Sequence, residues 1–204
     1  MRQRINILGC APGWEKAPLD GSNGEIWGLN DVHLCTKVDV VVDVHNLQRI
    51  IKGKEKIRRS PEVIKKCLKN LKKTKTICYS TKEIKNIPNI KKYPYKEIVK
   101  KYDSDYFGSG PDYAVALAIY KGATEIHTYG ILMCIDEEYA HQKPTFEHWL
   151  GIAKGAGVKV IIHDSNNMSS ILRTKNGFIY GYNTPQRWKE MVMQYPTQFI
   201  ESYS

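Results

Sequence analysis

A cluster of side chains able to bind a ligand or take part in catalysis follows a short apolar segment in the second half of the chain. Residues 125–129 predict a buried strand, and Gly130 ends it. Open α/β sheets bind their ligands where polar groups follow a strand end. The groups here are a thiol, carboxylates, a phenol, an amide and imidazoles: Cys134, Asp136, Glu137, Glu138, Tyr139, His141, Gln142 and His148. We therefore expect a ligand site at this strand end, with Gly130 at its edge.

Carboxylates and imidazoles are also metal ligands, so this cluster has to be tested as a metal site. Neither the His-x-x-x-His nor the His-x-x-Glu spacing occurs in it. The stretch 136–141 is more typical of a solvated acidic loop, and we expect no metal and no cofactor. Taken by itself, His148 beside Trp149 is more typical of a histidine at the edge of the core than of a general base.

The first predicted strand, at 5–9, runs directly into a loop of small residues. Small side chains let backbone N–H groups approach a phosphate, as phosphate-binding turns require. The full GxGxxG fingerprint is absent, so a plain strand and loop fits this piece equally well. The candidate nucleotide-binding residues of this loop are Gly9, Cys10, Ala11 and Pro12.

Two further predicted strands end in polar residues. The segment 25–30 ends at Asn30, and the β-branched segment 38–43 ends at Asp43. His45 lies two positions beyond Asp43, so both side chains would point the same way. One histidine beside one carboxylate is more often structural than catalytic. Asn30, Asp43 and His45 are nevertheless candidates at the ligand edge of the sheet.

A helix start lies in the middle of the chain, in the run Ser109-Gly110-Pro111-Asp112. Ser109 can cap the first free N–H groups, and Asp112 can reach back to Ser109. Pro111 fits because the first helical turn has no use for its missing N–H. Ser109 and Gly110, at the start of this helix, are also candidate nucleotide-binding residues.

Short apolar strands alternate with helical segments along the chain. The strands are expected at 5–9, 25–30, 38–43, 76–79, 125–129 and 158–162. Helices are expected at 109–122, 145–154 and 185–195, with a lysine-rich helical insert at about 47–101. This alternation predicts an α/β fold with a doubly wound, mostly parallel sheet and helices on both faces. The length favours a single domain over 1–204.

Most of the positive charge is concentrated in one quarter of the chain. Residues 49–101 contain 19 Lys and Arg against 4 Asp and Glu, a net charge of +15, whereas the rest of the chain carries −5. A lysine-rich solvated face is the simplest interpretation. The alternative is a surface for nucleic acid, where lysines favour a diffuse field over base readout. Within this segment, 82–101 is expected to be an irregular connection with a brief helix near Glu97.

The cysteines and the hydropathy bear on the compartment. The 5 cysteines are scattered without a CxxC pair, which favours reduced thiols over a disulfide framework or a zinc finger. No apolar run approaches the roughly 18 residues that a membrane span needs. The opening residues turn polar too soon for a secretory signal. These observations predict a soluble cytoplasmic protein without a membrane partner, located in the host cytoplasm if the chain is viral.

Several motifs resemble the bacterial sialyltransferases of the Campylobacter type and their uncharacterised phage relatives. Residues 116–131, ALAIYKGATEIHTYGI, resemble the family's AxAIxxGYKEIYLSGID body, and Tyr113 falls on the tyrosine of its (T/S)SGxY start. Residues 147–151, EHWLG, resemble the family's SHYIG motif, and 9–13, GCAPG, resemble its opening GNGPS. Asn30 matches the family's second-strand asparagine. Together these pieces cover most of the chain in the family's order.

The resemblance implies a Rossmann-like fold that binds a cytidine-type nucleotide-sugar without a metal. It would place the general base on His148 and a phosphate-contacting tyrosine on Tyr139. Glycosyl transfer needs a base that takes the acceptor proton and a donor that steadies the leaving phosphate.

The chain also departs from the family pattern. Cys10 and Ala11 replace an asparagine and a glycine of the loop, and Cys134 aligns with a second phosphate-contacting tyrosine. The lid before the histidine motif is shorter, only 135–147, and a lid excludes water from a reactive donor. Specificity for sialic acid is not carried over.

Two main functions remain open. The chain is expected to act either as a small glycosyltransferase-like enzyme or as a non-catalytic protein that sequesters a nucleotide signal. The second function is one that a phage-encoded protein could have. The enzyme's acceptor could be a nucleotide or a nucleic acid, given the basic segment 49–101. A third interpretation, a nucleic-acid-binding module, depends on 52–101 alone and predicts steep salt dependence. A homo-oligomer is compatible with the sequence.

Overall fold

The computed structural model describes residues 3–55, 59–133, 137–163 and 171–172. The chain divides into two compact units, residues 1–171 and 172–204. The first unit contains every helix and strand described below. The helix expected at 185–195 falls outside the described residues, and the single domain over 1–204 stays a prediction.

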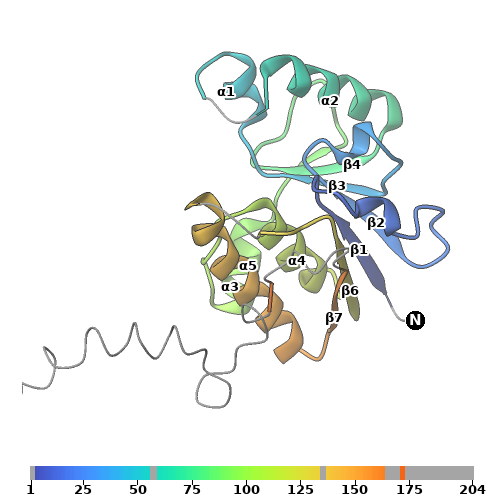
Figure 1. Cartoon of the computed structure of the whole chain (residues 1–204). Helices are drawn as coiled ribbons and strands as arrows, with labels where there is room; N and C mark the ends of the chain where they lie inside the picture. The colour runs from blue at the N-terminus through green and yellow to red at the C-terminus, as the bar shows by residue number, and fades with distance from the viewer. Residues whose placement is uncertain (1–2, 56–58, 134–136, 164–170, 173–204) are drawn as a thin grey trace, which may run out of the picture. The chain divides into compact units, whose positions relative to one another are not determined.

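The centre of the first unit is one seven-stranded sheet, drawn edge-on in Figure 1. Its strand order is β5-β4-β3-β2-β1-β6-β7, and every neighbouring pair is parallel. The predicted doubly wound sheet is therefore confirmed, and it is wholly rather than mostly parallel. The strands are β1 (Arg4–Leu8), β2 (Glu25–Leu29), β3 (Val40–Asp43), β4 (Ile77–Ser80), β5 (Ile90–Lys92), β6 (Glu125–Tyr129) and β7 (Lys159–His163).

Helices cover both faces of this sheet. Figure 1 shows α1 (Leu47–Ile51) and α2 (Pro61–Thr74) on one side. It shows α3 (Tyr95–Tyr102), α4 (Gly110–Tyr120) and α5 (Glu137–Gly155) on the other. The short 3-10 helices η1 (Trp14–Lys16) and η2 (Val32–Leu34) follow β1 and β2. None of the helices described is long and apolar enough to cross a membrane.

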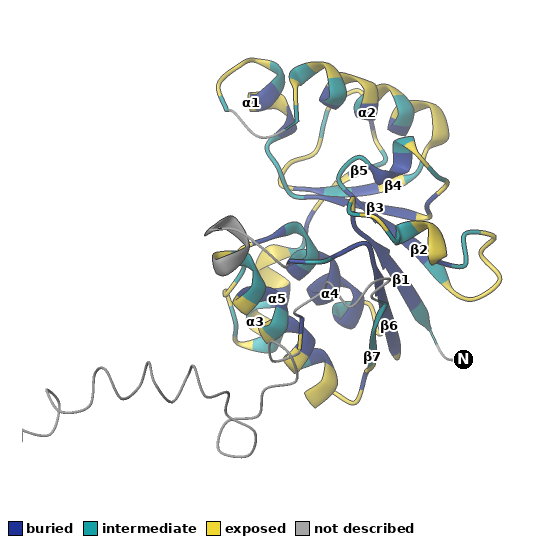
Figure 2. Ribbon diagram, viewed as in Figure 1, coloured by how far each residue is buried: buried dark blue, intermediate teal, exposed yellow. Residues whose placement is uncertain are grey.

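The main core lies between the sheet and α4. Side chains alternate along β1, so Ile5 and Ile7 join the core with α4, whereas Leu8 packs on the opposite face. The helix α4 is buried on nearly all sides, including Ala114 and Leu117. A helix that is apolar all round needs cover on every side, and α3 and α5 both contact α4. Figure 2 shows this buried helix beside the buried strands.

The lysine-rich segment contributes to the sheet as well as to the helices. In α2, Ile64, Cys67 and Leu71 are buried, whereas its lysines are exposed on the outer side (Figure 2). The helix α2 is therefore amphipathic, with its lysines on the solvated face. The connection expected at 82–101 is more ordered than predicted, because it contains β5 and the two-turn helix α3. A strand as short as β5 is held by its pairing with β4, which no local pattern reveals.

The helix α5 begins earlier than predicted, at Glu137 instead of residue 145. From Glu137 onward, the acidic stretch expected to be a loop belongs to this helix. Pro144 lies inside the helix. Burial of Phe146, Trp149 and Leu150 stabilises α5 despite that proline.

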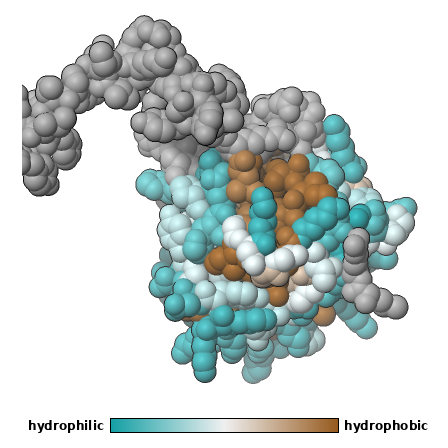
Figure 3. Space-filling view, turned by 90° about the horizontal axis from the view of Figure 1, so that it is seen from below, coloured by the Kyte–Doolittle hydropathy of each residue, from teal (hydrophilic) through white to brown (hydrophobic). Residues whose placement is uncertain are grey.

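Hydrophobic side chains gather on the surface seen from below (Figure 3). Figure 1 places β6, β7 and the C-terminal end of α5 on this side. Three hydrophobic residues of β7 and α5 are only partly buried: Ile152, Val160 and Ile162. β7 is also an edge of the described sheet.

Candidate functional site

A cavity of about 560 Å³ opens at the C-terminal ends of β1, β2, β3 and β6. The chain leaves β1 toward β2 on one side, and β6 lies on the other, so this is the topological switch point of the sheet. The cavity brings together most of the predicted nucleotide-binding residues: Gly9, Cys10, Ala11, Asn30, His45, Ser109, Gly110 and Gly130. Pro12 and Asp43, also predicted, are not among the lining residues.

The floor of the cavity is made of backbone where β1 and β6 end. The Gly9 N–H donates to the Tyr129 carbonyl oxygen at 2.8 Å, and the Ala11 N–H donates to the Gly130 carbonyl at 3.0 Å. A Cβ atom on Gly9 would lie 2.3 Å from the Gly130 oxygen. Gly130 itself has a φ of +63°, which favours glycine. Glycine at both positions therefore permits the close approach of the two strand ends.

Asn30 lines this cavity and carries a buried acceptor without a partner in the described part of the chain. The residue adopts a φ of 53°, and its N–H donates to the Val42 carbonyl at 3.1 Å. Its side-chain Oδ1 is buried and has no hydrogen-bond partner among the described residues. Buried polar atoms are rarely left without a partner. An N–H or O–H group of a ligand would satisfy this oxygen.

The start of α4 forms another part of the wall. Asp112 accepts hydrogen bonds from the N–H groups of Ser109, at 2.8 Å, and Gly108, at 2.7 Å. This confirms that Asp112 reaches back to Ser109. Burial raises the pKa of Asp112, although these hydrogen bonds oppose the shift. The N–H of Gly110 has no acceptor within the described parts of the chain, so it is available to an anion.

An aromatic wall, not predicted from the sequence, lines the same cavity. Phe107 and Tyr113 are lining residues, and their rings stack with centroids 4.3 Å apart. Phe107 also stacks on Trp149 of α5, with centroids 4.6 Å apart. A nucleobase or a sugar face can pack against such rings. Spaced aromatic residues at 102–113 are the only sequence signal for this wall.

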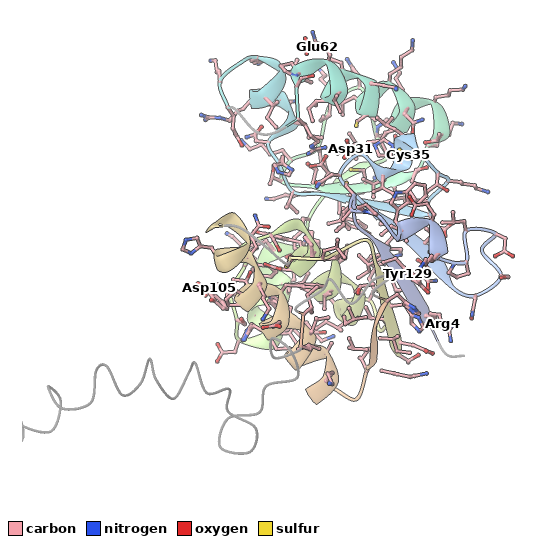
Figure 4. The ribbon with its side chains drawn as sticks, in the orientation of Figure 1. Arg4, Asp31, Cys35, Glu62, Asp105 and Tyr129 are labelled. Atoms are coloured by element: carbon pink, nitrogen blue, oxygen red, sulfur yellow. The ribbon has the colours of Figure 1, made fainter. Side chains whose placement is uncertain are left out.

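The charged groups near the cavity are paired with one another. No Lys or Arg is found among the described lining residues. The Cys10 thiol lies 3.4 Å from Asp31, whose place at the end of β2 is seen in Figure 4. Burial and the Asp31 carboxylate raise the pKa of Cys10 to about 12. Cys10 is therefore a protonated thiol at neutral pH and a poor nucleophile.

Asp43 lies behind His45 in a buried ion pair. Its carboxylate accepts two hydrogen bonds from Arg59, at 2.8 and 2.9 Å, and lies 2.8 Å from Nδ1 of His45. Burial alone would raise the pKa of Asp43, but the hydrogen bonds with His45 and Arg59 hold it at about 2. From the sequence, Arg59 was expected only as one residue of the basic segment. Asp43, which pairs with Arg59, orients His45 and does not line the cavity.

The two residues expected to be catalytic have different positions. His148 is exposed on α5, its Nε2 lies 2.7 Å from the Ser104 hydroxyl, and it does not line the cavity. The backbone of Tyr139 belongs to α5, but its side chain is not described. Cys134 and Asp136 lie outside the described residues. From α5, Gln142 reaches the cavity wall.

A second titratable cluster lies on β1, β6 and β7. Glu125 accepts from Arg4 at 3.2 Å and pairs with Lys159 at 3.0 Å and His127 at 2.8 Å; Arg4 is labelled in Figure 4. Nδ1 of His127 lies 2.8 Å from Nε2 of His163. None of these residues lines the cavity.

Across the part of the chain that is described, no group of three or more His, Cys, Asp or Glu could hold a metal ion.

Several solved structures have a similar fold. Sialyltransferase CstII from Campylobacter jejuni in complex with cytidine-5'-monophosphate (CMP) is 15% identical, with a TM-score of 0.54 over 87% of this chain and 88% of that one. CstII with a trisaccharide acceptor and CMP is 14% identical, with a TM-score of 0.53 over 95% and 98%. The monofunctional α-2,3-sialyltransferase Cst-I from C. jejuni is 13% identical, with a TM-score of 0.51 over 95% and 93%. This chain shares its fold with these sialyltransferases.

Comparison by sequence alone gives no such match. The chain matches no family model and no curated protein. The Rossmann-like α/β fold implied by the short motifs is confirmed by the sheet and by the solved neighbours.

Proposed function

We propose that this protein binds a cytidine-type nucleotide-sugar in the cavity at the switch point and transfers the sugar to an acceptor hydroxyl. Asn30 carries the proposal, because it lines the cavity and its buried Oδ1 has no partner among the described residues, so a ligand donor that reaches this oxygen would supply the missing hydrogen bond. The exocyclic amine of cytosine and the ribose hydroxyls are donors of this kind.

The composition of the wall favours a nucleoside monophosphate as the leaving group. Polyphosphate sites use lysines or metal ions to balance several negative charges. The described wall offers instead the Gly110 N–H, which has no acceptor among the described residues, at the start of α4. One such N–H at a helix start suits a single phosphate. The stacked rings of Phe107 and Tyr113 suit a base or a sugar face.

The ligands of the solved neighbours agree with this chemistry. CstII was captured with CMP, with CMP-3FNeuAc and with a trisaccharide acceptor together with CMP. Tyr139 remains our proposed phosphate contact, and the short segment 135–147 our proposed lid. The donor sugar and the acceptor are left open here.

The second candidate is a protein that sequesters a nucleotide signal without turnover, as a phage-encoded protein could. It is favoured by Cys10 and Ala11 in the loop and by the exposed position of His148. Calorimetry with CMP, UMP, ADP and nucleotide-sugars, followed by mass spectrometry, separates the two candidates. Binding of a CMP-sugar with release of CMP supports the transferase, and intact ligand after binding supports sequestration.

Replacing Asn30 by glycine should weaken CMP binding about tenfold. The variant removes the amide but keeps the backbone free to adopt the positive φ. One lost hydrogen bond of roughly 1.4 kcal/mol corresponds to that factor. Calorimetry measures the affinity, with Asn86→Gly, at an exposed asparagine outside the cavity, as the matched control. Unchanged affinity in Asn30→Gly would remove the central support for the proposal.

Salt distinguishes the cavity from the basic segment 49–101 as the nucleotide site. With no Lys or Arg in the described wall, the affinity for CMP should change less than about threefold between 50 and 200 mM salt. Binding of a single-stranded oligonucleotide to the exposed lysines of α2 would instead fall by about a thousandfold or more. Fluorescence anisotropy with both ligands measures the two slopes. A steep slope for CMP would place it on the basic surface.

A further inference from the structure

We propose that Nε2 of His45, rather than His148, is the general base that takes the proton from the attacking hydroxyl. The inference deepens the proposed function and depends on it. His45 lines the cavity and is oriented from behind by a buried carboxylate. This is the arrangement in which a nucleophile's base is held by a third group.

The carboxylate beside His45 favours one position for the ring proton. Nδ1 lies 2.8 Å from Oδ1 of Asp43, which can only accept because it is ionised. Nη2 of Arg59, which carries two N–H groups, donates one to Oδ1 of Asp43 at 2.9 Å and lies 2.9 Å from the same Nδ1. We take the shorter contact, with Asp43, as the one that Nδ1 makes, and this puts the proton on Nδ1 as donor to the carboxylate. The lone pair of the ring is then on Nε2.

Nε2 is free to act in the cavity. It has no hydrogen-bond partner in the described parts of the chain, and the side chain of His45 is 33% exposed. The same cavity is lined by Asn30, whose buried Oδ1 has no partner among the described residues, and by Gly110, whose N–H has none there either. A base, a group for the nucleoside and a group for the phosphate therefore share one space.

His148 has neither of these properties. Its Nε2 is occupied by the Ser104 hydroxyl, and no carboxylate is bonded to its ring among the described residues. Its ring lies against Tyr106, on the outside of α5. A general base must reach the proton that it removes, either directly or through one water.

The step balances without any further reactant. The acceptor hydroxyl oxygen forms a bond to the anomeric carbon with its own electron pair, while its proton moves to Nε2 of His45. The bond between the anomeric carbon and the phosphate oxygen breaks, and its electron pair leaves with the nucleoside monophosphate. The imidazolium that results is stabilised by the Asp43 carboxylate, which Arg59 holds in place. With water as acceptor, the same step is hydrolysis of the donor.

The test uses the full chain and follows release of CMP from CMP-N-acetylneuraminate, with calorimetry of CMP. In His45→Asn, the side-chain amide can still donate to Asp43 but offers no base. We expect a fall in kcat of about a hundredfold or more, with CMP affinity within threefold. The same substitution at His148, where the resemblance puts the base, should change kcat less than threefold.

Three results would overturn the inference. Normal turnover in His45→Asn excludes His45, and loss of turnover in His148→Asn alone returns the role to His148. If the wild-type protein binds CMP but releases none from the donor, the transfer proposal fails and the base with it. If His45→Asn does not fold by thermal unfolding, His45→Gln, whose amide extends into the cavity, carries the same expectation.

Discussion

Gly9→Ala should destabilise the protein by about 3 kcal/mol and abolish binding of CMP. The new Cβ would lie 2.3 Å from the Gly130 carbonyl oxygen and 2.7 Å from Cγ1 of Ile131. The oxygen belongs to backbone and cannot move aside like the end of a flexible side chain. Separating β1 from β6 would strain the hydrogen bonds that join Gly9 to Tyr129 and Ala11 to Gly130. The estimate combines overpacking with loss of these bonds.

Urea unfolding measures the change in stability, and calorimetry measures binding. Gly151→Ala is the matched control, because no atom lies within 4 Å of a Cβ at this exposed position of α5. Alanine favours a helix over glycine by about 1 kcal/mol, so this variant should be slightly more stable. If Gly9→Ala were as stable as the wild type and still bound CMP, the two strand ends would not meet as closely as described.

Asp43→Asn should cost about 3 to 5 kcal/mol of stability, the second large effect that we expect. The amide can no longer pair with Arg59, whose side chain is only 12% exposed. A buried charge that loses its partner is costly, more so than the pair is stabilising. The variant should also lower kcat, because His45 loses the group that orients it.

Acid should lower the stability of the wild-type protein, because it protonates the Asp43 carboxylate. The pKa of Asp43 is about 2 in the folded protein and 3.8 ordinarily. A lowered pKa contributes stability above the ordinary value, and that stability is lost as the pH falls from about 4 to about 2. The difference amounts to roughly 2 kcal/mol. In urea unfolding at a series of pH values, Asp43→Asn should lose less stability than the wild type as the pH falls through this range.

Asp105→Asn is the control for both measurements, because Asp105 is exposed (Figure 4). This substitution should change the free energy of unfolding by less than about 0.5 kcal/mol. Equal stability of Asp43→Asn and Asp105→Asn would mean that Arg59 does not depend on Asp43. If acid destabilised Asp43→Asn as much as the wild type, the loss of stability would belong to another carboxylate, with Glu125 as the next candidate.

Local sequence determined the elements with strong internal signals. The β-branched run of β3 and the apolar segments of β1 and β6 were predicted because strand burial shows in hydrophobic patterning. The start of α4 was predicted because Asp112 caps a residue only three positions away. Parallel strands end at one edge of the sheet, so glycine and polar residues at those ends already indicated the ligand edge.

The tertiary structure decided whatever depends on residues far apart in the chain. β5 is held by its pairing with β4, and α5 continues through Pro144 because its apolar side is buried. Arg59 meets Asp43 across a connection, and Phe107 stacks on Trp149 of a later helix. The sequence could suggest both His45 and His148 as polar groups near strand ends. Only packing put His45 in the cavity wall and left His148 outside it, because contacts between distant elements leave no periodic trace in the sequence.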